Sequence, residues 1–158
     1  MFKTNSEILV YLINLFNCKK IAEIGVSRGL TSLYVLKNCS HIETYFMIDP
    51  NSEALDNTIL KIFNKAIFLK EYSNKAVKNF DDFSLDLVYI DAQHDYEAVK
   101  EDINLWYPKV KQNGILCGHD YTLSEPCCGV IKAVNEKFSF INLIEEENGN
   151  KTWWFKKE

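Results

Sequence analysis

Two segments of the chain place aspartate and histidine directly after a short apolar run. The segment "VYIDAQHDY" carries Asp91 and His94, and the segment "ILCGHDY" carries His119 and Asp120. If the two apolar runs are neighbouring parallel strands, these four side chains leave the same edge of a sheet. Carboxylates beside imidazoles can bind a divalent cation or move a proton. The alternative is that two acids cap local structure and two histidines lie exposed, and we favour the convergence.

The repeated letters His-Asp-Tyr do not make the two segments equivalent. Asp91 ends the apolar run of the first segment, whereas Asp120 ends that of the second. Asp95 belongs to the first His-Asp-Tyr and directly precedes the helical pattern "YEAVKEDI", so we expect it to be a helix N-cap. The repeat is therefore a coincidence of letters.

The segment "EIGVSRG" reads as an apolar run that enters a glycine turn and then a helix. Gly25 allows a tight turn and a close approach of the backbone to a ligand, and Gly29 helps the helix begin. The spacing is GxxxG rather than the GxGxxG of dinucleotide-binding proteins. Glu23 lies inside the apolar run, where an acid without a partner is costly to bury. It either holds a cationic or amine-bearing ligand or anchors the loop.

Asp49 follows the next apolar run, in "YFMIDP". An acid at the end of a second strand, about two dozen residues after a glycine turn, suits the hydroxyl groups of a ribose. The alternative is a cap for a helix that Pro50 opens, and the two roles are compatible. With the glycine turn upstream, we favour the ribose role.

The elements that position these residues follow from an alternation of apolar runs and helical patterns, which predicts an α/β fold with a doubly wound parallel sheet. Asn148-Gly149 is a strong hairpin dipeptide between two further strand-like runs, so five parallel strands and an antiparallel C-terminal hairpin make seven. The expected strands are residues 20–26, 44–49, 66–70, 85–91, 114–120, 138–147 and 151–157, and the expected helices are 30–38, 52–65, 74–80, 95–110 and 129–138.

Apolar residues at helical spacing indicate which helix faces pack on the sheet. A further amphipathic helix is expected at the N-terminus, because this segment lacks the features of a signal peptide. The expected buried positions are Ile8, Leu12, Leu15 and Phe16 in that helix, Leu55, Ile59, Ile62 and Phe63 in residues 52–65, and Val99, Ile103, Trp106 and Val110 in residues 95–110.

Composition limits the class of protein. The 158 residues are 47% hydrophobic and 13% aromatic, which suits a single domain over residues 1–158 with a sizeable core. The net charge of -4 without a basic cluster argues against nucleic acid as a partner. No apolar run approaches the roughly 20 residues of a membrane span. We expect a small-molecule substrate.

The five cysteines are Cys18, Cys39, Cys117, Cys127 and Cys128. An odd count without CxxC spacing fits neither a disulfide framework nor a zinc ribbon, so reduced thiols in the cytoplasm are expected. The adjacent Cys127 and Cys128 could form a redox pair or a soft metal site. Small loop residues are the interpretation that we favour.

Several of these segments together resemble class I S-adenosylmethionine-dependent methyltransferases. The likeness rests on "AEIGVSRGLTS", "FMIDP", "LDLVYIDAQHDYEAVKEDINLWYPKVKQNGILCGHDY" and "GVIKAV". The chain is similar to the small Rossmann-like members of this class, in which the fourth strand ends in Ile-Asp-x-x-His-x-Tyr and the fifth ends in Gly-His-Asp-Tyr. The departures are "QNG" in place of a more usual Pro-Gly-Gly turn, and the cysteine pair before the last helix.

The resemblance implies S-adenosyl-L-methionine as cofactor and a role for each matching residue. Asp49 would bind the ribose hydroxyls, Tyr72 and Ser73 would lie near the adenine, and Asp91 would sit between cofactor and substrate. The methionine part would be surrounded by Glu23, Gly25, Ser27, Arg28, Gly29 and Ser32.

Related oxygen methyltransferases hold a divalent cation with acids at the ends of the fourth and fifth strands. Asp91 and Asp120 match those places, so the resemblance implies a site for Mg²⁺ or another divalent cation, with help from His94 or His119. The expected reaction is oxygen methylation of a small, sugar-like acceptor, with Asp120 and the two histidines in catalytic roles. A nucleotide-dependent oxidoreductase and a non-catalytic, regulatory cofactor-binding domain are the alternatives.

We expect no extension that would cover a substrate. The pocket is therefore expected to be shallow or to be completed by a second subunit in a homo-oligomer. Trp153 and Trp154 in the last expected strand could serve such an interface or pack on a sheet face. Alternation along a strand points only one of the two inward.

Overall fold

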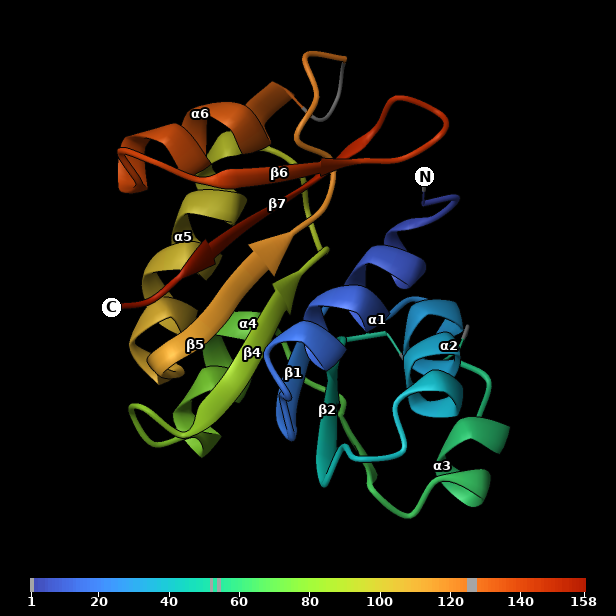
Figure 1. Cartoon of the computed structure of the whole chain (residues 1–158). Helices are drawn as coiled ribbons and strands as arrows, with labels where there is room; N and C mark the ends of the chain where they lie inside the picture. The colour runs from blue at the N-terminus through green and yellow to red at the C-terminus, as the bar shows by residue number, and fades with distance from the viewer. Residues whose placement is uncertain (1, 52, 54, 125–127) are drawn as a thin grey trace.

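The computed structural model describes residues 2–51, 53, 55–124 and 128–158 as an α/β fold around one sheet (Figure 1). Strands that are buried on both faces need apolar residues at successive positions, which is why short apolar runs form them. Across the described residues the sheet has seven strands, in the order β3-β2-β1-β4-β5-β7-β6. These are β1 (Lys20–Ile24), β2 (Thr44–Ile48), β3 (Ala66–Leu69), β4 (Leu85–Ile90), β5 (Val110–Gly118), β6 (Asn142–Glu145) and β7 (Lys151–Lys156).

The direction of the strands confirms the predicted Rossmann-like, mostly parallel sheet with an antiparallel C-terminal hairpin. The pairs from β3 to β5 are parallel, and β7 runs antiparallel to both β5 and β6. The chain winds outward from β1 to β3 and then returns to place β4 on the other side of β1. This reversal lies between β1 and β4, and ligands of doubly wound folds bind at the strand ends beside such a switch point.

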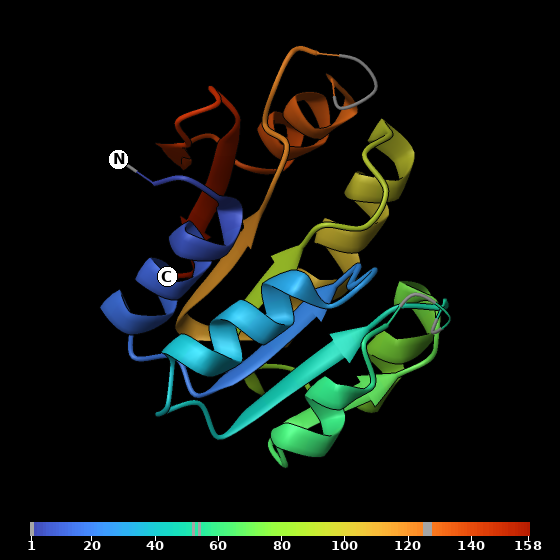
Figure 2. The same cartoon turned by 90° about the vertical axis from the view of Figure 1, so that its right-hand side faces the viewer.

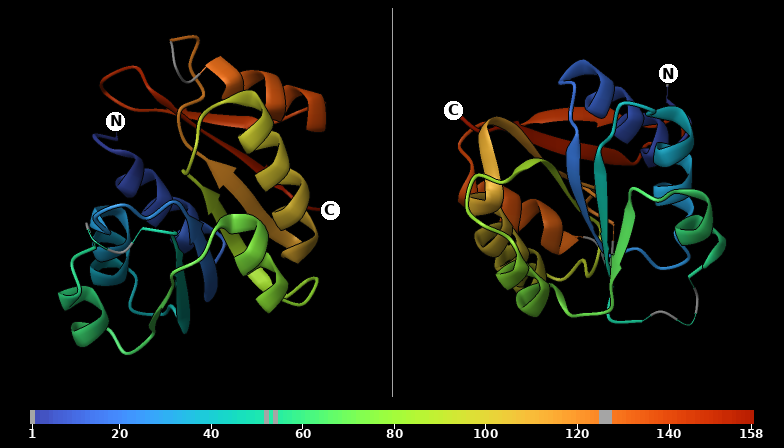
Figure 3. Two further views of the ribbon diagram at one scale, coloured as in Figure 1. Left: turned by 180° about the vertical axis from the view of Figure 1, so that it is seen from behind. Right: turned by 90° about the horizontal axis from the view of Figure 1, so that it is seen from below.

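Helices cover both faces of the sheet (Figures 2 and 3). One buried cluster joins the first three helices to one face, and a second cluster joins the later helices to the other face. Side chains of β4 alternate between them, with Leu87 and Tyr89 in the first cluster and Val88 and Ile90 in the second. The helices are α1 (Asn5–Leu15), α2 (Leu30–Asn38), α3 (Thr58–Ile62), α4 (Ser73–Ala76), α5 (Tyr96–Trp106) and α6 (Cys128–Lys137), with 3-10 turns η1 (Val77–Asn79) and η2 (Tyr107–Lys109).

The expected helix over residues 52–65 is the largest difference from the sequence prediction. Among the residues of this range that the structure describes, 53 and 55–65, the only helix is the short α3. Ile59 is buried there and Ile62 is 65% exposed, so the expected burial of Ile62 was wrong. The Asp56 carboxylate accepts a hydrogen bond from the backbone N–H of Thr58 at 2.9 Å. This local bond satisfies a free N–H at the start of a helix, which explains why α3 begins only at Thr58.

Two smaller corrections concern the ends of helices. Leu15, at the end of α1, is 53% exposed, although Ile8 and Leu12 are fully buried as expected. Val110 is buried, but it is the first residue of β5 rather than the last turn of a helix, because Pro108 lies in η2 and α5 ends at Trp106.

The two tryptophans of β7 both pack inside the chain. Trp153 is fully buried with the second cluster, and Trp154 packs on the first, with its ring centroid 5.3 Å from that of Phe16. Trp154 packs with the cluster that includes α1, and Trp153 packs with the cluster that includes α6, so both faces of β7 are covered. Both tryptophans therefore pack on a face of the sheet, which is one of the two roles that the sequence left open.

The described cysteines Cys18, Cys39 and Cys117 are free and buried. Cys127 lies outside the described residues. Cys128 begins α6. Among the described residues, no helix combines the length and the apolar character that crossing a membrane requires.

Candidate active site

A cavity of about 410 Å³ opens at the C-terminal ends of β1, β2 and β4. This is the position that the switch point of the sheet predicts. The cavity is lined by six of the ten residues that we expected to bind the cofactor, namely Gly25, Ser27, Asp49, Tyr72, Ser73 and Asp91. The other four, Glu23, Arg28, Gly29 and Ser32, do not line it.

The glycine loop after β1 is pressed against the chain that leaves β4. Gly25 has φ +90, and a Cβ placed on it would lie 2.3 Å from the carbonyl oxygen of Asp91 and 2.5 Å from Cα of Ala92. Only glycine fits this position, because a side chain would meet rigid backbone and φ is positive. Gly29, with φ +78, packs against the side chain of Ile59 instead.

Asp49 ties the end of β2 to the glycine loop. Its Oδ2 accepts hydrogen bonds from the backbone N–H groups of Val26, at 3.0 Å, and Ser27, at 2.8 Å. Its Oδ1 accepts one from Asn51 at 2.8 Å. The next helix begins at Thr58, so Asp49 does not cap a helix that Pro50 opens. A carboxylate has about four acceptor positions, so Oδ1 can accept a further hydrogen bond.

Glu23 is buried and belongs to the core rather than to the cavity. The hydroxyl groups of Ser32 and Tyr45 donate hydrogen bonds to its carboxylate, the latter at 2.9 Å. Burial raises the pKa of Glu23 from 4.5 to about 8, although these two hydrogen bonds partly oppose the rise. Glu23 therefore joins β1 to α2 and β2, and its expected contact with the cofactor stays a prediction.

Asp102 is a cavity residue that sequence reasoning missed. It lies in α5, lines the cavity and accepts a hydrogen bond from the Ser73 hydroxyl. Ser73 in turn accepts one from the indole N–H of Trp106 at 2.7 Å. The signal was available, because Asp102 lies between Val99 and Trp106 on the helix face that is otherwise apolar.

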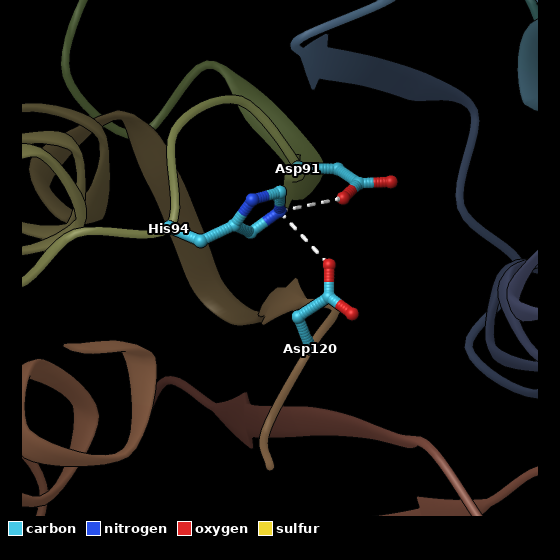
Figure 4. A group of neighbouring side chains, drawn as sticks. All are labelled: Asp91, His94 and Asp120. Atoms are coloured by element: carbon cyan, nitrogen blue, oxygen red, sulfur yellow. Dashed lines mark ion pairs between the residues drawn. The ribbon is translucent and has the colours of Figure 1, made fainter. Parts of the chain in front are cut away.

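Asp91, which lines the cavity, converges with His94 and Asp120, as the paired segments predicted (Figure 4). Because β4 and β5 are parallel neighbours, Asp91 and Asp120 emerge at the same edge. Nε2 of His94 lies 2.9 Å from Oδ2 of Asp120 and 3.5 Å from Oδ1 of Asp91. One ligand atom from each residue lies within 4.8 Å of the others, a spacing that could hold a metal ion. Asp95 caps α5 through Ala98 N–H at 3.1 Å, as expected.

His119 contacts the same group from behind Asp120. Its Nδ1 lies 3.3 Å from Oδ2 of Asp120, and its Nε2 lies 2.5 Å from Oε1 of Glu146. The side-chain amide of Asn150 donates to Oδ1 of Asp120 at 2.7 Å. Glu146 and Asn150 lie in the connection between β6 and β7, and neither was predicted.

Charge within this group shifts the affinity of both histidines for protons. The carboxylates of Asp120 and then Asp91 raise the pKa of His94 to about 10. Burial opposes protonation of His119, but Asp120, Asp91 and Glu146 outweigh it and raise its pKa to about 9. The two imidazoles hold the pKa of Asp120 far below its usual range. Without a metal ion, the group is therefore two carboxylates balanced by imidazolium at neutral pH.

Asp91 is held by a hydrogen-bonded pair from a distant segment. The Tyr89 hydroxyl donates to Oδ2 of Asp91 at 3.1 Å and accepts from the Asn5 amide at 3.0 Å. Asn5 also lies 3.4 Å from the same carboxylate oxygen. This arrangement leaves Oδ1 of Asp91 facing His94.

A comparison with protein families finds a match that includes most of the candidate site. A family model described as a methyltransferase domain matches residues 22–121. That range begins in β1 and ends just after Asp120, so it includes the glycine loop, Asp49 and the group around Asp91.

Solved structures share the fold at low sequence identity. An O-methyltransferase from Bacillus cereus in complex with S-adenosylhomocysteine aligns with a TM-score of 0.75 and 11% identity, over 99% of this chain and 82% of that one. A Staphylococcus aureus protein, described as a candidate caffeoyl-CoA O-methyltransferase, aligns with a TM-score of 0.78 and 16% identity, over 99% of this chain and 84% of that one. Spermidine synthase from Thermotoga maritima aligns with a TM-score of 0.70 and 17% identity, over 97% of this chain and 59% of that one. Such likeness establishes the fold, which serves more than one reaction.

One curated relative is the uncharacterized protein y4gI of Sinorhizobium fredii. It is 32% identical over 62 residues, which make up 39% of this chain and 7% of that protein. The match therefore spans a small part of the relative's length.

Proposed function

The chain belongs to the methyltransferase domain family, and from this premise we propose that it moves a methyl group from S-adenosylmethionine to an oxygen atom of a small acceptor at a divalent cation. The proposal rests on the position of Asp91, which belongs both to the cavity and to the candidate metal site. This residue lines the cavity and also offers an oxygen to the group formed with His94 and Asp120. Donor and acceptor sites would therefore share a wall.

The cavity offers the donor several contacts in this proposal. The backbone of Gly25 and Ser27 approaches the methionine part, and Oδ1 of Asp49 accepts a hydrogen bond from a ribose hydroxyl. Tyr72 and Ser73 lie at the adenine end. Glu23 and Ser32 act indirectly, by holding α2 on β1, and Gly29 shapes the turn. Arg28 is exposed and would reach the methionine part only from outside the cavity.

The residues present fit a divalent cation. Nε2 of His94 is buried between two carboxylates, 2.9 Å from Oδ2 of Asp120 and 3.5 Å from Oδ1 of Asp91. These two negative charges hold a positive charge on the imidazole, and a divalent cation would take the place of its Nε2 proton, because metal binding requires the neutral imidazole. Two carboxylates with one imidazole suit Mn²⁺, Fe²⁺ or Zn²⁺ as well as Mg²⁺. A bound cation would lower the pKa of an acceptor hydroxyl, as it does for water.

In the proposed reaction the bond between the methyl carbon and sulfur breaks while a bond to the acceptor oxygen forms. The sulfur keeps the electron pair of the broken bond and leaves as S-adenosylhomocysteine, and the hydroxyl proton passes to water. The sulfonium methyl is already activated, so the main task of the chain is alignment. Asp91, His94 and Asp120 would hold the cation, which would supply a positive charge beside the acceptor oxygen. His119, fixed between Glu146 and Asp120, acts as a positioning residue that balances their charge. A rim of carboxylates and imidazoles suits a hydroxyl-rich, sugar-like acceptor.

Calorimetric titration tests the cofactor first. We expect S-adenosylhomocysteine to bind and NAD not to bind, and we expect Asp49→Ala to lose that binding. Binding of NAD alone, or of neither ligand, would contradict the donor assignment.

The cation is tested separately, by titration with Mn²⁺. Asp120→Asn keeps the size of the side chain but removes a charged ligand, so we expect Mn²⁺ affinity to be lost while S-adenosylhomocysteine still binds. The matched control is Asp95→Asn, an equal change of charge next to His94, since asparagine caps a helix as well as aspartate does. Equal Mn²⁺ binding by Asp120→Asn and the control would remove the basis for the metal site.

A further inference from the structure

The wall of the cavity formed by α5 holds an acid to which the proposed function gives no role. Asp102 is 6% exposed, and it lines the cavity together with Tyr72 and Ser73. The small part of Asp102 that is not buried therefore faces the cavity. A buried carboxylate without a matching partner is costly, so the site favours an occupant that donates a hydrogen bond.

The hydrogen bonds around Asp102 have a fixed direction. The indole N–H of Trp106 can only donate, so Oγ of Ser73 accepts this bond. The proton of the Ser73 hydroxyl then points to Oδ1 of Asp102. Burial raises the pKa of Asp102 to about 6, which leaves it ionised at neutral pH, so both of its oxygens act as acceptors.

The second oxygen of Asp102 is the free one. Among the described residues, no hydrogen bond reaches Oδ2, whereas Oδ1 is occupied by Ser73. The Trp106–Ser73 pair also prevents the carboxylate from turning freely, because rotation would break the bond to Ser73. Asp102 therefore presents one acceptor held by Ser73 in a cavity whose lining includes neither His94 nor Asp120.

We propose that Oδ2 of Asp102 accepts a hydrogen bond from the exocyclic amino group of the adenine ring and so selects adenine over a purine with oxygen at that position. This inference rests on the proposed function, which puts the adenine end of the donor beside Tyr72 and Ser73. The ring of Tyr72, which is 64% exposed, offers a flat surface at the same end of the cavity. An oxygen in place of the amino group would face the carboxylate with no hydrogen between them.

The experiment compares S-adenosylhomocysteine with S-inosylhomocysteine, which carries oxygen in place of the amino group, by calorimetry at pH 7.5. For the unmodified chain we expect S-adenosylhomocysteine to bind on the order of 10- to 100-fold more tightly, since a buried acceptor is left unpaired with the other ligand. In Asp102→Asn the amide oxygen can accept from Ser73 while the NH₂ group faces the cavity. We expect this variant to lower the preference at least about tenfold.

The control is Glu97→Gln, an equal change of charge on the exposed side of α5, outside the cavity lining. We expect it to keep the preference of the unmodified chain. Equal binding of the two ligands by the unmodified chain would overturn the role of Asp102 and leave the proposed function intact, and it requires no variant to fold. An unchanged preference in folded Asp102→Asn would overturn it as well. Failure to bind either ligand would instead refute the proposed function.

Discussion

Replacing Tyr89 with phenylalanine tests whether the core orients the proposed metal ligand Asp91. The change removes one hydroxyl that is fully buried and that joins Asn5 to Asp91 by bonds of 3.0 and 3.1 Å. Without it, Oδ2 of Asp91 keeps only the 3.4 Å contact with Asn5. The carboxylate can then rotate and turn Oδ1 away from His94.

Two lost hydrogen bonds at a net value of about 0.5–1.5 kcal/mol each predict a loss of roughly 1–3 kcal/mol in the free energy of unfolding. With a denaturant slope of about 2 kcal/mol per molar urea, the unfolding midpoint should fall by about 0.5–1.5 M. Loss of a residue that orients a ligand typically weakens metal binding by about 10- to 100-fold. We expect Mn²⁺ affinity to fall by that factor.

Tyr45→Phe is the matched control. It removes the same hydroxyl from an equally buried tyrosine of β2, but that hydroxyl donates to Glu23 rather than to Asp91. Urea unfolding should show a loss of stability for both variants, smaller for Tyr45→Phe because its hydroxyl makes one hydrogen bond, and calorimetry with Mn²⁺ should separate them. If Tyr89→Phe binds Mn²⁺ as tightly as Tyr45→Phe does, Tyr89 does not orient a metal ligand and the reasoning is refuted.

Three further changes have definite expected outcomes. Gly25→Ala adds a Cβ at 2.3 Å from the Asp91 carbonyl oxygen with φ +90, so thermal melts should show a loss of about 2 kcal/mol or more, and an unchanged melt would contradict the close packing. Gly149→Ala, with φ +86 and open space around it, should cost only about 1 kcal/mol and leave S-adenosylhomocysteine binding unaltered in calorimetry. The pKa of Glu23 rises on folding from 4.5 to about 8, so the stability from its bound proton is present below pH 4.5 and declines as pH rises to about 8. Glu23→Gln stays neutral and should flatten that decline in urea unfolding measured from pH 5 to 8.

The part of the site that lies at strand ends could be predicted from the sequence. Apolar runs fix the strands, and the acid that ends each run marks the sheet edge where the cavity lies. Asp49, Asp91 and Asp120 were found in this way, because a parallel sheet brings the C-terminal ends of its strands to one edge. His94 followed from its spacing after Asp91.

The residues that complete the site could not be predicted, because their positions depend on tertiary contacts. Glu146 and Asn150 reach Asp120 and His119 only because β7 lies between β5 and β6, which no local pattern determines. Asn5 reaches Asp91 through the packing of α1 on the sheet. Asp102 differs, since an acid on an apolar helix face is visible in the sequence.

The route by which the chain assembles follows from the hairpin between β6 and β7. Asn5 and Asp91 are 86 positions apart, and Glu146 joins His119 across 27 positions, with a further bridge from Phe2 to Glu146. Contacts that close longer loops form later in folding, because the entropy of closure is lost before they repay it. The pairing of β1 with β4 joins Ile21 to Leu87, whereas the pairing of β5 with β7 joins Gly118 to Trp153 and closes a shorter loop. We therefore expect the C-terminal hairpin to fix Asp120 and His119 before Asn5 reaches Asp91. Pulsed hydrogen exchange should then show the amides of β7 protected before those of β1.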